Sequence, residues 1–84
     1  MWQYLVVSKG WTLWKEDRRR DMGWFLPAEA PTIEPDASLQ QGCAVLGRHG
    51  WELVAVTFER ADTESFVREE HTLFFKKPEQ AARR

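Results

Sequence analysis

Leu46-Gly47-Arg48-His49-Gly50-Trp51-Glu52-Leu53-Val54 is the stretch in which the hydrophobic period of this chain changes. Before it, three apolar residues follow the i, i+4, i+7 spacing of one helix face: Leu39, Cys43 and Leu46. After it, residues 51–59 alternate around a β-branched centre, with Trp51, Leu53, Ala55 and Thr57 opposite Glu52, Val54, Val56 and Phe58. Gly50 can adopt the left-handed conformation that ends a helix after His49. The stretch therefore predicts a helix followed directly by a strand.

The start of this helix is predicted by the residues before it. Three prolines lie in a connector that cannot be helical: Pro27, Pro31 and Pro35. Ser38 and Gln41 have the spacing of a capping box, so we expect the helix to begin near Ala37. Gly42 is costly inside a helix and indicates a close approach to the sheet.

The N-terminal third predicts strands. Residues 2–7 alternate and are rich in aromatic and β-branched side chains, and residues 8–10 supply turn chemistry. Two short apolar runs, 11–14 and 23–26, then flank the charged residues 15–21. This pattern indicates either a hairpin or an irregular loop, because seven linking residues exceed the usual two to five.

The C-terminal part predicts a second hairpin. Residues 60–65 are polar turn formers, and residues 66–77 form the returning strand. Leu73-Phe74-Phe75 is apolar on both faces, which is typical of a central strand. Pro78 ends it, and residues 79–84 are expected to form a flexible charged tail. We thus expect one α+β domain over residues 1–78, with a single helix packed on one face of a mostly antiparallel sheet of three to five strands, in the order β, hairpin, α, β, β.

Composition restricts the function classes. The 84 residues leave room for one core, and a net charge of -1 provides no global positive field for nucleic acid or acidic membranes. A single cysteine cannot form an internal disulfide, and no apolar run is long enough to span a bilayer. We therefore expect a cytoplasmic protein with no membrane partner.

The junction quoted above resembles the signature Leu-Gly-x-x-Gly-Trp-Glu-Leu-Val of a small bacterial family known as domain of unknown function four-one-seven-seven. The opening strand Trp2-Gln3-Tyr4-Leu5-Val6-Val7 and the ending Phe75-Lys76-Lys77-Pro78 are also similar to that family's pattern. The resemblance covers the first strand and residues 39–78, while residues 8–36 are longer and richer in tryptophan than the family pattern. It implies a fold in which Gly47 and Gly50 shape the helix exit, and it implies no activity.

Candidate chemistry is sparse. The residues that offer an acid/base or metal site are His49, Glu52, Glu69, Glu70 and His71. Glu69 and His71 share a strand face, but the spacing supplies no third ligand, and cross-strand charge pairing explains the same residues. We expect Cys43 to be a small apolar residue of the core. We expect no catalytic residue, no metal and no cofactor, so the sequence favours a protein that is not an enzyme.

Arg18-Arg19-Arg20 lies between tryptophans and offers a weak hypothesis of single-stranded nucleic-acid binding. Glu16, Asp17 and Asp21 cancel most of its charge, which favours a solvated loop tip instead.

The chain carries more aromatic surface than one helix can cover. Eleven aromatic residues must be covered either by residues 11–26 folding over the second sheet face or by another subunit. We therefore predict a protein-interaction or homo-oligomerising module, formed through the uncovered sheet face or through strand edges, with an unidentified protein as another possible partner. The predicted interface residues are Trp11, Trp14, Trp24 and Phe25. The competing interpretation is that all five tryptophans serve one monomer's core.

A second function class stays open. A small ligand can bind in an apolar pocket between helix and sheet or between subunits, with polar groups from Tyr4, Glu52 and His71.

Overall fold

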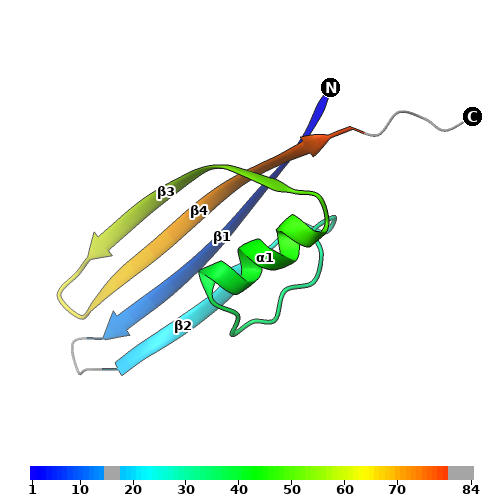
Figure 1. Ribbon diagram of the computed structural model, residues 1–84. Coiled ribbons are helices and arrows are strands. Elements are labelled where there is room, and N and C mark those ends of the chain that lie inside the picture. Colours follow the sequence, from blue (N-terminus) through cyan, green and yellow to red (C-terminus); the bar gives the residue numbers. More distant parts are fainter. Residues whose placement is uncertain (15–17, 80–84) are drawn as a thin grey trace, which may run out of the picture.

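A computed structural model describes residues 1–14 and 18–79, with residue 14 and residues 18–21 described by their backbone only. Its elements are β1 (Trp2–Trp14), β2 (Arg18–Phe25), α1 (Leu39–Arg48), β3 (Glu52–Asp62) and β4 (Phe66–Pro78). The strands form one sheet in the order β2-β1-β4-β3, and every neighbouring pair is antiparallel (Figure 1). The predicted α+β class is confirmed at the level of one helix and a four-stranded antiparallel sheet.

The predicted end of the first strand is wrong. β1 continues through residues 8–10, which pair with both neighbouring strands instead of turning. Lys9 is buried there beside the core residue Val7. Turn-forming side chains do not interrupt a strand that has a ladder partner on each side, because its backbone groups are already satisfied.

Residues 11–26 form a hairpin, so the irregular-loop alternative is wrong. The hairpin connects β1 to β2 and includes the predicted apolar runs, but its link is residues 15–17, because residues 18–21 extend β2. Residues 15–17 themselves lie outside the described residues. Since β2 is one of the two edge strands of the sheet, charged residues are compatible with it.

Both predicted ends of α1 are close to the observed ones. Ser38 is the N-cap, its hydroxyl accepts from the Gln41 amide, and the Gln41 side chain accepts from the Ser38 amide, so the capping box is present. The helix begins at Leu39 rather than near Ala37. Gly50 has a φ of 89° and follows the C-cap residue His49, as expected for a left-handed helix end.

The hairpin of β3 and β4 forms as predicted, with a longer β3. This strand reaches Asp62, and a bulge at Val54 shifts the register between Leu53 and Ala55. The alternation predicted beyond Leu53 is therefore wrong, because the extra residue moves every later side chain to the other face. β4 lies in the middle of the sheet, as its apolar sequence indicated.

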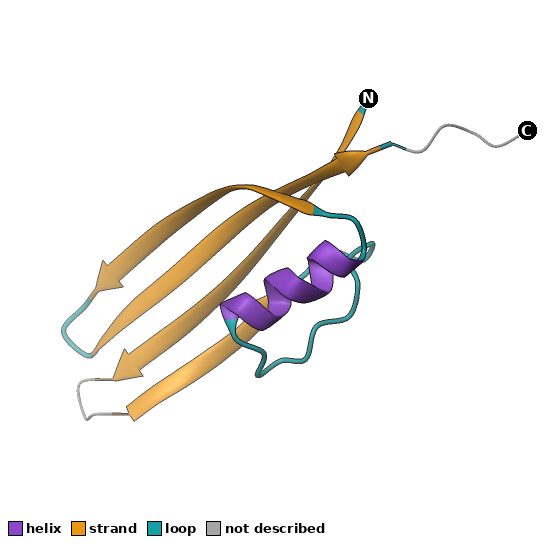
Figure 2. Cartoon of the chain, viewed as in Figure 1, coloured by secondary structure: helices purple, strands orange, loops and turns teal. Residues whose placement is uncertain are grey.

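The two faces of the sheet differ in cover. One face, here called the core face, carries four buried strand residues in one cluster with Leu46 of α1: Leu5, Val7, Leu73 and Phe75. The cluster also includes Ile33 and Ala37 from the connector and Trp51 at the helix exit. Figure 2 shows α1 and this connector on the viewer's side of the sheet. The opposite face is called the open face below.

Trp24 joins β2 to the helix on the core face. Its indole Nε1–H donates to the carbonyl oxygen of Ala37 at 3.0 Å. The ring lies against Gly42, where an added Cβ would come within 2.2 Å of the ring carbon Cζ2. Gly42 thus permits the close approach that its place in the helix predicted.

Candidate interaction surface

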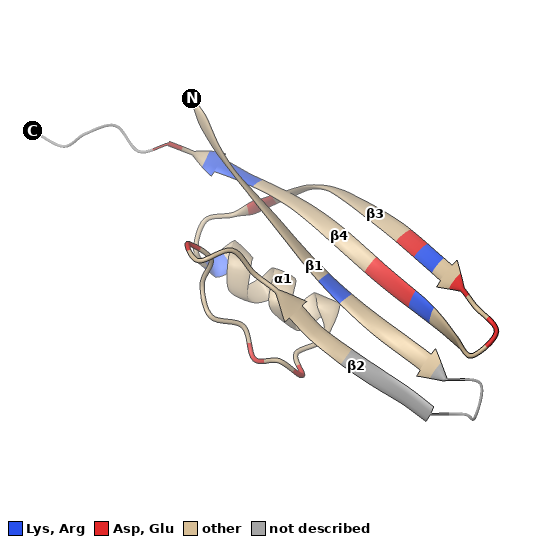
Figure 3. Cartoon of the chain, turned by 180° about the vertical axis from the view of Figure 1, so that it is seen from behind, with Lys and Arg blue, Asp and Glu red and all other residues tan. Residues whose placement is uncertain are grey.

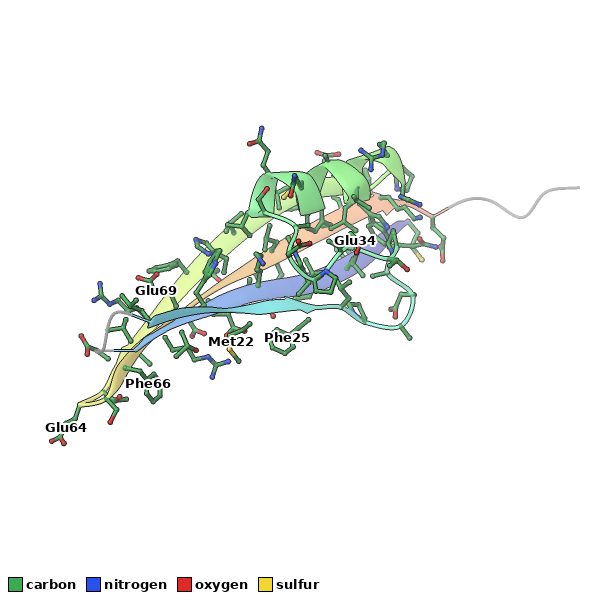
Figure 4. The ribbon with its side chains drawn as sticks, turned by 90° about the horizontal axis from the view of Figure 1, so that it is seen from below. Met22, Phe25, Glu34, Glu64, Phe66 and Glu69 are labelled. Carbon is green, nitrogen blue, oxygen red and sulfur yellow. The ribbon has the colours of Figure 1, made fainter. Side chains whose placement is uncertain are left out.

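The open face carries a group of large, exposed apolar side chains. These are Trp2, Tyr4 and Val6 of β1, Phe25 of β2 and Phe74 of β4. Tyr4 is 70% exposed, and Val6 and Phe25 are each 49% exposed. In Figure 4, Phe25, Met22 and Phe66 project from the side of the sheet opposite α1. Apolar groups of this size gathered on one face are typical of an interaction surface.

Cross-strand pairing arranges the open face in rows, each named here by its β4 residue. The Lys76 row contains Tyr4, Lys76 and Glu52. The Phe74 row contains Val6, Phe74 and Ala55. The Thr72 row contains Phe25, Ser8, Thr72 and Thr57. The Glu70 row contains Gly23, Gly10, Glu70 and Glu59.

Charge is confined to the outer rows. The Phe74 and Thr72 rows contain no charged residue, and Figure 3 shows the same uncharged stretch in the middle of β3 and β4. On one side of this stretch, the Lys76 ammonium lies 4.1 Å from the ring centroid of Trp2. On the other side, Glu59 and Glu70 are directly opposite one another. Like charges in this position destabilise a strand pair.

A surface hollow of about 260 Å³ surrounds the two glutamates, lined by Glu59, Arg60, Ala61, Arg68 and Glu70. Arg68 reaches a carboxylate oxygen of Glu70 at 4.0 Å, and the side chain of Glu70 is only 25% exposed. One long ion pair offsets little of the repulsion between two facing carboxylates.

The four predicted interface residues do not share one surface. Phe25 lies on the open face, whereas Trp24 packs against α1 on the core face. Trp11 also lies on the core face, where its ring packs edge-on against the His71 ring with 5.5 Å between the ring centroids. Trp14 ends β1 opposite Phe66, and its side chain lies outside the described part. Sequence reasoning missed Trp2, Val6 and Phe74, although Trp2, Tyr4 and Val6 alternate with the buried Leu5 and Val7.

The three predicted ligand residues are divided between the faces. Tyr4 and Glu52 flank Lys76 in one row of the open face, while His71 lies on the core face. A second hollow of about 450 Å³, between the connector and α1, is lined by other residues, among them Thr32, Gln41 and Arg48. Neither hollow contains any of the three predicted residues.

A buried cation is the main core-face feature that the sequence did not reveal. Lys9 is 1% exposed, and its ammonium lies 5.5 Å from the Trp11 ring centroid and 5.6 Å from that of Trp24. Attraction to ring faces favours a cation in such a place. Beside it, His71 packs against Trp11 and Phe58, and its buried Nδ1 has no hydrogen-bond partner within the described residues.

Other candidate chemistry does not assemble. Among residues 1–14 and 18–79, no three His, Cys, Asp or Glu residues gather in a group that could hold a metal ion. His49 caps α1, and its Nδ1 lies 3.0 Å from the Val45 carbonyl oxygen. Burial raises the pKa of the Cys43 thiol, which disfavours the reactive thiolate. The Arg18-Arg19-Arg20 side chains and residues 80–84 of the predicted tail lie outside the described part of the chain.

Over the same described ranges, no helix combines the length and apolar character needed to cross a membrane. No family model, no curated protein and no solved structure matches this chain. The family resemblance of the helix-to-strand junction therefore stays a prediction.

Proposed function

We propose that this protein is a non-enzymatic homo-oligomerising module in which α1 packs on one sheet face and a second copy of the chain covers the other. The observation that carries the proposal is the exposed apolar set on the open face, centred on Tyr4, Val6 and Phe74. Aromatic residues are enriched at interface centres because they bury large areas with few rotatable bonds.

The dimensions of the open face suit a dimer. β1 has 13 residues. β2 has 8 residues, β3 has 11 and β4 has 13, so at about 3.3 Å per residue and about 4.8 Å between strands the sheet presents roughly 700 Å². A stable interface buries about 800 Å² per partner. The face also has an uncharged centre and charged outer rows, which is the usual anatomy of an interface.

The β3 edge is less suited to receive the second copy. All eleven residues of β3 are exposed, so its edge is accessible. However, the Val54 bulge interrupts it, and charged residues lie at both of its ends. Bulges and charges are the features by which edge strands avoid pairing with other chains. We therefore place the second copy on the open face.

Two valines provide a matched test of this assignment. Val6 is 49% exposed on the open face, and Val56 is 48% exposed on the core face, opposite Leu73. We expect wild-type protein and Val56→Glu to sediment as dimers at micromolar concentration and Val6→Glu to sediment as a monomer, because a carboxylate at the interface centre must be desolvated. Sedimentation equilibrium measures the mass, and circular dichroism verifies that both variants are folded.

A wild-type monomer at 100 µM, a concentration at which weak dimers still form, contradicts the proposal. Equal dimerisation of both variants contradicts the open face as the interface, and loss of the dimer in Val56→Glu alone assigns it to the core-face side of β3.

A further inference from the structure

We infer that the second copy lies on the open face with its strands reversed, so that Lys76 of each copy enters the hollow between Glu59 and Glu70 of the other. This inference rests on the proposed function and adds the orientation of the two copies. It assigns an intermolecular salt bridge to a glutamate pair that the isolated chain leaves facing each other.

The charges supply the first argument. Glu59 and Glu70 are directly opposite across β3 and β4, and the guanidinium of Arg68 reaches a carboxylate oxygen of Glu70 only at 4.0 Å. A cation placed between two such carboxylates relieves their repulsion. Lys76 is on the same face, six residues away along β4, and its ammonium lies over the Trp2 ring. No row lies between the two charged rows except the uncharged Phe74 and Thr72 rows.

Reversal of the strands brings these charged groups together. A two-fold axis that lies between the two sheets and parallel to them, perpendicular to the strands and midway between the Phe74 and Thr72 rows, reverses the order of rows and keeps β4 over β4. The Lys76 row of one copy then meets the Glu70 row of the other. Packed sheets keep their strand directions within about 30°, so rows still meet rows after twisting. The alternative, a two-fold axis parallel to the strands, places each row opposite the same row of the other copy. Glu70 of one copy then lies near Glu70 of the other.

Side-chain size supports the same orientation. Where Lys76 meets Glu70, Tyr4 meets Gly10, which has no side chain and pairs with Gly23. In the centre, the large residues Val6 and Phe74 meet the small residues Ser8 and Thr72. Large residues facing small ones allow two sheets to interdigitate at native packing density.

One match is unfavourable, between Glu52 and Glu59 of the other copy. Both lie on the edge strand β3, and both are exposed. Water screens charges at such positions, so their repulsion is small.

Charge reversal tests the orientation. We expect Lys76→Glu and Glu70→Lys each to weaken dimerisation at least about tenfold, because each leaves like charges together at the interface. The double variant Lys76→Glu/Glu70→Lys restores the pair with exchanged partners, and we expect its dissociation constant to return to within about threefold of wild type. Lys77→Glu is the matched control, since Lys77 is the next residue, packs on Trp51 on the core face and undergoes the same change of charge.

Sedimentation equilibrium at two salt concentrations provides the readout, and thermal unfolding verifies the fold of each variant. If Lys76→Glu does not fold, Lys76→Gln replaces it, with a smaller expected loss. A dimer that Val6→Glu abolishes and Lys76→Glu leaves unchanged overturns the orientation but not the proposed function. Failure of the double variant to recover also overturns the pairing of Lys76 with Glu70. A wild-type monomer at all concentrations overturns both proposals.

Discussion

Gly42 gives up helix propensity to make room for Trp24. Glycine costs a helix interior about 1 kcal/mol relative to alanine. Here the ring of Trp24 occupies the space of a Cβ, and its indole N–H bonds to Ala37 in the residues that precede the helix. A single glycine therefore determines how closely β2 and α1 approach.

We expect Gly42→Ala to destabilise the protein by about 1–2 kcal/mol, because overpacking at 2.2 Å outweighs the gain in helix propensity. Gly47→Ala is the control, since no atom outside the helix backbone lies within 4 Å of a Cβ at this position. We expect it to stabilise by roughly 0.5–1 kcal/mol. Urea unfolding at one protein concentration measures both changes, and stabilisation by Gly42→Ala is the result that contradicts this account.

The structural role of Gly42 could be predicted from the sequence, whereas that of Lys9 could not. A glycine inside a helical pattern has few explanations, so its role followed from local sequence. Lys9 has the same identity as any solvated lysine, and its burial beside Trp11 and Trp24 follows from the long strand that the sequence did not predict. The same limit applies to Trp24, whose type suggested an interface although its ring serves the chain's own core.

Among the elements, α1 depends on its cap. The helix has only ten residues and no acidic residue in its first turn, so the Ser38 hydroxyl is the side-chain group that satisfies the Gln41 amide. Short helices have little stability of their own.

We expect Ser38→Ala to lower the free energy of unfolding by about 1 kcal/mol, because it removes the capping oxygen. Ser38→Asp keeps an acceptor and adds a negative charge near the helix N-terminus, so we expect it to equal or slightly exceed the wild type. Chemical unfolding followed by circular dichroism compares the three proteins. Equal losses in the two variants indicate that the cap is not the cause.

Element ends were predictable where one residue type enforces them. Ser38 caps the start of α1, and Gly50 follows its C-cap with a left-handed backbone. Both observed ends of the helix lie next to these residues. Strand ends depend on partners instead. β1 extends through Ser8, Lys9 and Gly10 because β2 and β4 pair with these residues. The sequence of residues 2–10 alone does not indicate which strands will pair with it.

At the scale of the whole molecule, stability should depend on association. The chain's own core is small, and the proposed dimer would remove the open face from water. We expect the wild-type Tm to rise by a few degrees for each tenfold increase in protein concentration, because association is linked to folding by mass action.

Differential scanning fluorimetry over a hundredfold range of concentration measures this rise. We expect Val6→Glu to unfold at a constant Tm, and a constant Tm in a wild-type protein that is dimeric throughout shows that the monomer's core is sufficient by itself.

Sequence reasoning predicted an uncovered face but not which residues form it. Counting aromatic residues against one narrow helix was enough to indicate excess apolar surface. Placing that surface required the strand order, because the Phe74 row contains residues from β1, β4 and β3 that lie far apart in the chain. The Val54 bulge also exchanges the faces of β3, and no single-strand alternation reveals a bulge.

That extra residue also bears on how far the proposed assembly can extend. A sheet face is buried once a second sheet packs on it, so it cannot bind a third copy. A straight edge strand, in contrast, can pair with one copy after another and form a filament. Val54 bends the border of β3 beside Leu53 and Ala55, where the strand is most apolar. In the proposed dimer, this bulge disfavours growth by lateral addition at the β3 edge.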